Sequence, residues 1–132
     1  AMGHEVHGVD TSADAVRDCA EGALAAGLAG PAPVVAELSD ALRAFVRGEQ
    51  RFDVILLDPP RSGASDAIPW LVELAPARIV YVACDPVSLA RDAGALLRAG
   101  YAISSVRCLD LFVHTHHVET IAVLDRVAGD PT

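Results

Sequence analysis

The stretch "ARIVYVACDPVSLARDAGALLRAG", residues 77–100, decides the fold class. Up to Cys84 it is an apolar run without strict alternation, which predicts a strand that is buried on both faces. A helix is predicted to follow at once, because Asp85 suits the N-cap, Pro86 the first helical position and Gly100 the residue beyond the end. A buried strand that leads directly into a helix is the building unit of a parallel α/β sheet.

The same alternation of apolar runs and helical stretches extends through the rest of the chain. Further strands are predicted at 4–10, 33–37, 52–60, 101–111 and 117–127, and further helices at 11–27, 39–48 and 63–74. This order predicts an α/β fold with a doubly wound, mostly parallel sheet. The whole chain, residues 1–132, is expected to belong to one domain.

The composition agrees with this fold and limits the class of protein. Hydrophobic residues make up 52% of the chain but aromatic ones only 5%, so aliphatic side chains must fill the core. The formal net charge of -8 argues against electrostatic binding of nucleic acid over the whole surface of this chain. No apolar run approaches the roughly 20 residues of a membrane span, and no secretion signal is recognisable. A cytoplasmic protein without membrane contact is therefore expected.

The three cysteines, Cys19, Cys84 and Cys108, are widely spaced and form no CxxC pair. This spacing argues against a disulfide framework or a zinc knuckle and favours a reducing compartment. Cys19 and Cys108 are expected to be small core residues, the usual role of an unpaired cysteine. Cys84 differs, because it lies where a strand becomes a helix, and helix amides there stabilise a thiolate. We therefore interpret Cys84 as a nucleophile.

Polar or reactive residues stand at the carboxyl ends of four predicted strands: Asp10, Glu37, Asp58 and Cys84. Ligands of doubly wound sheets bind beyond these ends, so the four residues predict one site. Asp10 suits a ribose-binding carboxylate, and a cap for the helix at 11–27 is an equally good interpretation. Asp58 opens "DPPRSG", whose two prolines stiffen the loop. This favours a carboxylate that accepts hydrogen bonds from a ligand over a simple helix cap.

The segment "HTHHVE", residues 114–119, is a second concentration of reactive groups. His114, His116 and His117 lack the i, i+4 spacing of a helical zinc site, and the last two would point to opposite faces of a strand. No bound metal is expected. Glu119 is interpreted as a general base, with a solvated strand residue as the alternative.

Four collinear segments, "VHGVDTSADAV", "FDVILLDPPRSG", "VYVACDPVSLARDAGALLRAGY" and "DLFVHTHHVETIAVL", resemble the RNA uracil-5 methyltransferases and cover nearly the whole chain. That family uses S-adenosylmethionine to form 5-methyluridine in tRNA or ribosomal RNA. The resemblance implies a Rossmann-like methyltransferase sheet and a tRNA or rRNA substrate. It also assigns Cys84 as the nucleophile, Glu119 as the base, and Asp10, Glu37 and Asp58 to the cofactor.

The resemblance covers only the later part of the family's catalytic domain. The first strand with its glycine-rich cofactor loop, and the family's usual N-terminal RNA-binding domain, are expected to be absent from residues 1–132. In folds of this kind the absent strand lies between the strands that end at Asp10 and at Asp58. These two strands are therefore expected either to pair directly or to recruit a strand from another copy. The chain alone is expected to bind the cofactor weakly and to be inactive.

Other classes of protein stay open from the residues alone. A dinucleotide-binding dehydrogenase would use Asp10 but has no need of Cys84. A non-catalytic fragment that binds RNA or a protein would need neither Cys84 nor Glu119. An adenine amino-methyltransferase is less suitable, because Arg61 stands where an aromatic residue would stack on the base.

Overall fold

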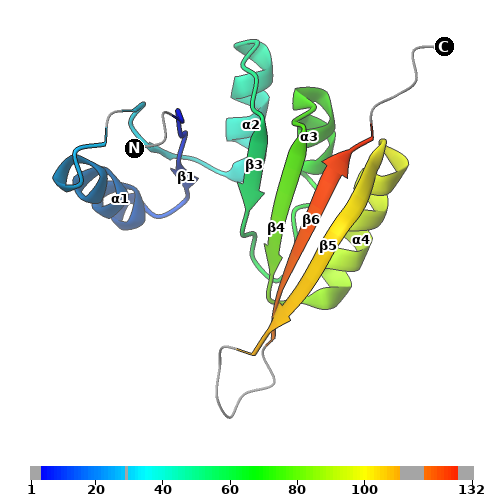
Figure 1. Cartoon of the computed structure of the whole chain (residues 1–132). Helices are drawn as coiled ribbons and strands as arrows, with labels where there is room; N and C mark the ends of the chain where they lie inside the picture. Colours follow the sequence, from blue (N-terminus) through cyan, green and yellow to red (C-terminus); the bar gives the residue numbers. More distant parts are fainter. Residues whose placement is uncertain (1–3, 29, 111–117, 128–132) are drawn as a thin grey trace. The chain divides into compact units, whose positions relative to one another are not determined.

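The computed structural model in Figure 1 describes three ranges of the chain, residues 4–28, 30–110 and 118–127. The chain divides into two compact units, Ala1–Ala44 and Phe45–Thr132, and helix α2 (Leu38–Arg47) runs across the division. The strands and helices follow the α/β alternation that the sequence predicts. Among the described residues, none of the helices has both the length and the apolar character to cross a membrane.

The N-terminal unit holds a parallel pair of short strands, β1 (Val9–Asp10) and β2 (Val34–Val35), which are joined through helix α1 (Ala13–Ala25). Ser12 is the N-cap of this helix, and its hydroxyl accepts a hydrogen bond from the backbone N–H of Ala15 at 3.2 Å. No described side chain of α1 is buried. Both strands are shorter than the sequence predicts, because only two residues of each take part in the ladder.

The C-terminal unit is built on a four-stranded sheet in the order β3-β4-β6-β5. Its strands are β3 (Val54–Leu57), β4 (Arg78–Ala83), β5 (Tyr101–Leu109) and β6 (Glu119–Arg126). β3 runs parallel to β4, whereas β6 runs antiparallel to both of its neighbours. The connection from β5 to β6 is shorter than the dozen or so residues of a parallel crossover, so the chain must reverse. The sheet is therefore mixed, within the predicted α/β class.

The sheets give one neighbour to each of the strands that end at Asp10 and Asp58. β1 pairs with β2, and β3 is an edge strand of the four-stranded sheet with β4 as its neighbour. Each strand keeps the neighbour that follows it along the chain, the commonest arrangement in sheets. The expectation that these two strands pair directly or recruit a strand from another copy stays a prediction.

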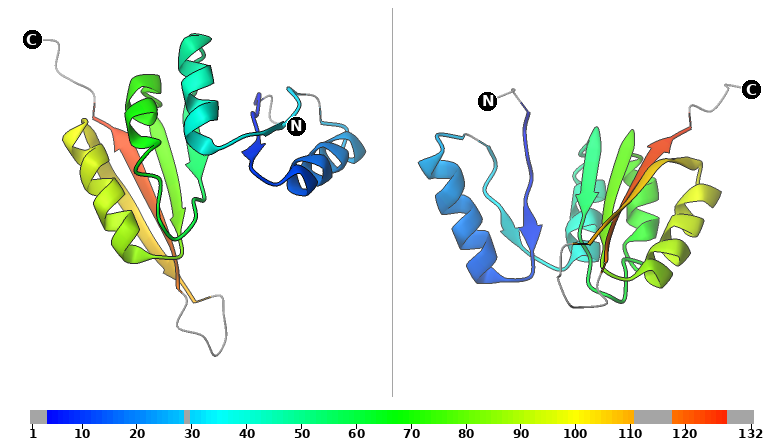
Figure 2. Two further views of the ribbon diagram at one scale, coloured as in Figure 1. Left: turned by 180° about the vertical axis from the view of Figure 1, so that it is seen from behind. Right: turned by 60° about the horizontal axis from the view of Figure 1, so that its bottom comes forward.

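Helices α3 (Ile68–Leu74) and α4 (Pro86–Arg98) lie on one face of the four-stranded sheet (Figure 2). α3 begins later than the predicted helix at 63–74, because the preceding residues form turns. Pro69 lies in the first turn of α3, where its missing N–H costs no hydrogen bond.

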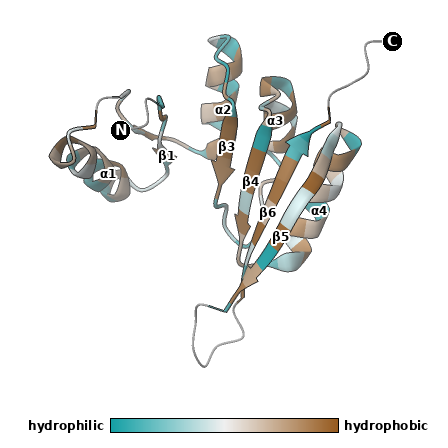
Figure 3. Ribbon diagram, viewed as in Figure 1, coloured by the Kyte–Doolittle hydropathy of each residue, from teal (hydrophilic) through white to brown (hydrophobic). Residues whose placement is uncertain are grey.

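The core of the C-terminal unit lies between the sheet and these two helices. Its most deeply buried side chains are Leu71, Pro76, Ile79, Tyr81, Asp92, Leu96 and Leu124. Figure 3 shows apolar residues along β3, β4 and β6, and the residues of β3 that alternate with buried Leu57 serve the other face of the sheet. On that face Val54 and Leu56 are 53% and 67% exposed. Successive residues of a strand serve opposite faces, which accounts for the unbroken apolar runs in the sequence.

Leu96 and Leu97 on α4 form a matched pair for testing this core, because Leu96 is fully buried and Leu97 is 44% exposed. We expect Leu96→Ala to lower the free energy of unfolding by about 2–5 kcal/mol, since it leaves a cavity. Leu97→Ala should lower it by less than about 1 kcal/mol. Urea denaturation followed by circular dichroism measures both losses, and equal losses would contradict the burial of Leu96.

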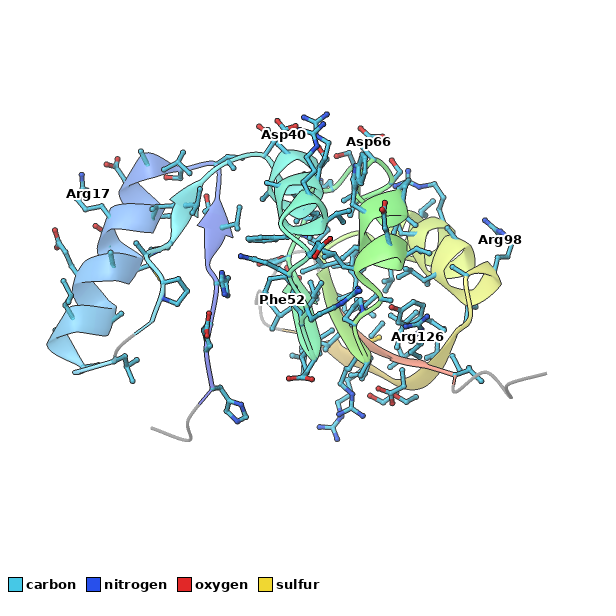
Figure 4. The ribbon with its side chains drawn as sticks, turned by 90° about the horizontal axis from the view of Figure 1, so that it is seen from above. Arg17, Asp40, Phe52, Asp66, Arg98 and Arg126 are labelled. Atoms are coloured by element: carbon cyan, nitrogen blue, oxygen red, sulfur yellow. The ribbon has the colours of Figure 1, made fainter. Side chains whose placement is uncertain are left out.

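Polar contacts fix the start of β4 and the end of β6. Arg78 and Asp125, which lie opposite each other, form a two-point ion pair with Nε–Oδ1 at 2.6 Å and Nη2–Oδ2 at 3.0 Å. The hydrogen bond from Arg78 is the main cause that lowers the pKa of Asp125. Arg126, labelled in Figure 4, donates to the carbonyl oxygen of Ala75 at 3.3 Å. These contacts lie at the end of the sheet where β4 begins, away from the end where Cys84 follows β4.

Candidate active site

Cys84 and Glu119 flank the last residue pair of β4 with β6. That pair is Ala83 with Thr120, and one further step in the same antiparallel register, beyond the end of the ladder, sets Cys84 opposite Glu119. Directly opposed residues of an antiparallel pair carry their side chains on the same face, with Cβ atoms roughly 5 Å apart. Both residues are partly buried. The predicted nucleophile and the predicted base therefore occupy neighbouring positions.

Cys84 directly precedes the start of α4, as the sequence predicts. Asp85 is the N-cap: its Oδ2 accepts the backbone N–H of Ser88 at 2.7 Å, and the Ser88 hydroxyl donates to the Asp85 carbonyl oxygen at 3.0 Å. The backbone hydrogen bond from Ser88 and, less strongly, the charges of Arg61 and Arg91 hold the pKa of Asp85 below its usual value. The cap stays ionised at neutral pH, which fixes the helix start beside Cys84.

Asp58 follows β3 at the same end of the sheet as Cys84, since β3 and β4 run parallel and pair Leu57 with Tyr81. Its side chain is exposed. The loop then turns sharply: the N–H of Gly63 donates to the carbonyl oxygen of Pro60 at 2.8 Å. Gly63 has a φ of 81°, a conformation that favours glycine. Asp58 is therefore displayed on a tightly turned loop.

Asp10 and Glu37 lie in the N-terminal unit. Asp10 ends β1, is exposed, and accepts the backbone N–H of Ser12 on its Oδ1 at 2.7 Å. Because Ser12 is the N-cap of α1, the interpretation of Asp10 as that cap is wrong. Glu37 is exposed, and its carbonyl oxygen accepts the backbone N–H of Ala41 in the first turn of α2. Both carboxylates lie at the carboxyl ends of parallel strands, where ligands of such sheets bind.

The other two cysteines contradict their predicted burial. Cys19 on α1 and Cys108 on β5 are exposed, whereas Cys84 is partly buried. α1 buries no described residue, and the edge strand β5 buries Tyr101 alone among its residues. The predicted burial is therefore wrong, because neither segment buries the position at which its cysteine lies. Cys19 and Cys108 can serve as exposed controls for any chemistry assigned to Cys84.

Metal ligation finds no support in the described part of the chain. There, no three side chains of His, Cys, Asp or Glu are arranged to hold an ion. The described residues do not include His114, His116 and His117. The prediction that these three histidines form no zinc site therefore stays a prediction.

One buried carboxylate near this edge of the sheet was not predicted from the sequence. Asp92 on α4 is 1% exposed and accepts a hydrogen bond from the loop that follows Asp58. A signal was present: Ser88, Asp92 and Leu96 recur at helical spacing on the buried face of α4. A charged residue on such a face is unusual and needs a partner.

Comparisons with known proteins identify relatives of this chain. The family model described as tRNA (Uracil-5-)-methyltransferase matches residues 38–127. A 23S rRNA (uracil(1939)-C(5))-methyltransferase RlmD from Pseudomonas aeruginosa is 42% identical over 120 residues, which are 91% of this chain and 27% of that protein. The protein of the same name from Yersinia enterocolitica is 50% identical over 80 residues, 61% of this chain and 18% of that protein. The chain thus spans about a quarter or less of the length of these relatives.

Solved structures show the same fold. The Pyrococcus abyssi tRNA (uracil-54, C5)-methyltransferase, in complex with S-adenosyl-L-homocysteine, matches with a TM-score of 0.75 at 31% identity over 92% of this chain and 29% of that chain. An rRNA methylase from Streptococcus thermophilus matches with a TM-score of 0.66 at 12% identity over 94% of this chain and 74% of that chain. The predicted Rossmann-like methyltransferase class is confirmed.

Proposed function

The chain belongs to the tRNA (uracil-5-)-methyltransferase family, and from this premise we propose that it is the catalytic segment of an enzyme that methylates carbon 5 of a uridine in RNA. S-adenosylmethionine is the proposed methyl donor. Ribosomal RNA is the favoured substrate, because the relatives at 42% and 50% identity are named as 23S rRNA enzymes, whereas the tRNA enzyme is 31% identical. A dinucleotide-dependent dehydrogenase has no support in this family.

The observation that carries the proposal is the pairing of Ala83 with Thr120, which brings the adjoining residues Cys84 and Glu119 to the same end of β4 and β6. Carbon 5 of uracil is a poor nucleophile, so the reaction needs a group that activates the ring and a base that later removes a proton. A thiolate can add to carbon 6 of the ring, and a carboxylate can accept the proton from carbon 5. Carbons 5 and 6 are neighbours, which suits two side chains on adjacent strands.

The proposed reaction runs through a covalent adduct. The thiolate of Cys84 adds to carbon 6, and the electron pair of the 5,6 double bond moves toward the carbonyl at carbon 4, which makes carbon 5 nucleophilic. A bound S-adenosylmethionine would supply its methyl group to carbon 5 and would leave as S-adenosylhomocysteine. Glu119 then removes the remaining proton from carbon 5, the double bond re-forms and the thiolate of Cys84 leaves. The uracil must be turned out of its stack to reach these groups.

The exposed carboxylates fit the donor groups of S-adenosylmethionine. Asp10 ends β1, Asp58 directly follows β3, and Glu37 lies two residues after the end of β2; all three are exposed acceptors. The cofactor presents ribose hydroxyls and amino groups as hydrogen-bond donors. We assign Asp10 to the ribose, and Glu37 and Asp58 to the amino groups. The bound cofactor supplies an electrophilic methyl group.

The test uses the full-length enzyme. This is the protein that contains the present chain together with counterparts of the additional segments found in its longer relatives. Incubated with methyl-labelled S-adenosylmethionine and unmodified 23S rRNA or tRNA transcripts, it should give labelled 5-methyluridine in the nuclease digest of the rRNA. Labelled 5-methyluridine in the tRNA alone would assign tRNA, and not ribosomal RNA, as the substrate. No label in either RNA would overturn the proposed function.

A further inference from the structure

Asp92 is a buried charge of the C-terminal unit, and both of its oxygens have polar partners. Its Oδ2 accepts hydrogen bonds from the backbone N–H of Ala64 at 2.6 Å and from the hydroxyl of Tyr81 at 2.7 Å. Its Oδ1 accepts a hydrogen bond from Nε of Arg91 at 2.9 Å and forms an ion pair with Nη2 of the same residue at 2.8 Å. A buried carboxylate costs several kcal/mol unless it is paired and hydrogen-bonded, and these four contacts meet that need.

Arg91 extends the arrangement to the backbone of the same loop. Its Nη2 donates to the carbonyl oxygen of Ser62 at 2.7 Å. Two positions of the loop after β3, Ser62 and Ala64, are therefore held by neighbouring residues of α4. We call Tyr81, Arg91 and Asp92 the latch.

Gly63 lies between the two latched positions, and the space beside it is closed. A Cβ atom built there would lie 2.5 Å from Nη2 of Arg91 and 2.5 Å from Oδ2 of Asp92. Its φ of 81° also disfavours other residues. Only a glycine lets the loop approach the latch this closely. The glycine at position 63 therefore suits both the positive φ and the short distance to Arg91 and Asp92.

The latch joins the two segments to which the proposed chemistry is assigned. The latched loop begins at Asp58, and Pro59 and Pro60 stiffen its first part, so the position of Ser62 constrains the direction of Asp58. Cys84 directly precedes Asp85, the N-cap of α4. Burial and, next, the hydrogen bond to Asp92 raise the pKa of Tyr81 far above its usual value, so its hydroxyl remains a donor at neutral pH.

We propose that Asp92 is a positioning residue for methyl transfer: with Tyr81 and Arg91 it fixes the loop that carries Asp58 against the helix that follows Cys84. This inference rests on the proposed function of the same site. Asp92 touches neither the RNA nor the methyl donor and acts through Asp58. Loss of the latch therefore weakens use of the methyl donor and leaves the thiol of Cys84 unchanged.

The test compares two latch variants with two matched controls in the full-length enzyme. Tyr81→Phe and Asp92→Asn weaken the latch. Tyr101→Phe removes an equally buried hydroxyl, which donates to a carbonyl oxygen at 2.9 Å. Asp125→Asn removes a carboxylate that pairs with an arginine at the opposite edge of the sheet.

We expect both latch variants to raise KM for S-adenosylmethionine at least fivefold, measured well below their melting temperatures. The rate of Cys84 alkylation should stay within twofold, and both controls should stay within twofold in KM. An unchanged KM in folded Asp92→Asn or Tyr81→Phe enzyme, or an equal rise in the controls, overturns the proposal. Tyr81→Phe keeps the test decisive if Asp92→Asn fails to fold.

A second measurement separates this inference from the proposed function, because it needs no activity. Hydrogen exchange in the 132-residue chain reports the amide of Ala64, which donates to Asp92, and that of Leu71, which donates to Ala67 within α3. Asp92→Asn should speed exchange at Ala64 at least tenfold and leave Leu71 within twofold. Unchanged exchange at Ala64 overturns the latch. If the wild-type enzyme transfers no methyl group while Ala64 responds, the proposed function fails and the latch stands as a structural fact.

Discussion

Cys84→Ala is expected to reduce RNA methylation by the full-length enzyme by on the order of 10⁴-fold or more, the size of loss seen when a covalent nucleophile is removed. Without the thiolate, carbon 5 of the uracil is not activated. Binding of S-adenosylmethionine should stay within twofold, because its proposed contacts are Asp10, Glu37 and Asp58. Methyl-transfer assays measure the first quantity and calorimetry the second.

Cys108→Ala is the control for this substitution. The Cys108 sulfur lies 3.9 Å from Oγ1 of Thr120, the residue next to Glu119, so its loss reports any disturbance of β6. Cys108 is exposed and has no proposed role, and its variant should keep activity within threefold. A Cys84→Ala enzyme that keeps a tenth of the wild-type rate would exclude the covalent route.

Glu119→Gln is expected to lower turnover by roughly 10²- to 10⁴-fold, the range for loss of a general base. The enzyme should then accumulate as a covalent adduct with methylated RNA, because the carbon 5 proton stays in place and the thiolate of Cys84 cannot leave. The amide keeps the size of the carboxylate, so the pairing of β6 with β4 should persist. A denaturing gel with labelled RNA shows the retained complex.

Two controls bracket the trapped adduct. Glu73→Gln changes an exposed carboxylate on α3 and should turn over normally without retained RNA. The double variant Cys84→Ala with Glu119→Gln should retain no RNA, since no bond to sulfur can form. Normal turnover by Glu119→Gln, with no retained band, would place the base on another residue.

Local signals made the start of α4 predictable. The cap at Asp85 and the first helical position at Pro86 act within one turn of helix, and the structure confirms both. The buried strand before them follows from its apolar run. Such features need only the residues that lie beside them in the chain.

The neighbouring positions of Cys84 and Glu119 could not be predicted in the same way. They depend on the register in which Ala83 meets Thr120, and residues far apart in the chain set that register. The exposure of Cys19 and the burial of Asp92 depend equally on what packs against them. Patterns along the chain predict candidate site residues, and tertiary contacts decide which of these lie near one another.

The antiparallel pairing of β4 with β6 also limits how a site of this kind can diverge over evolutionary time. A substitution within either strand leaves the pairing in place, so residue types there can change. Loss or gain of a single residue between Thr120 and Arg126 shifts the rest of β6 by one position and turns each shifted side chain to the opposite face. Differences in length among homologous chains should therefore fall in the connections between strands, and the number of residues within β6 should stay constant.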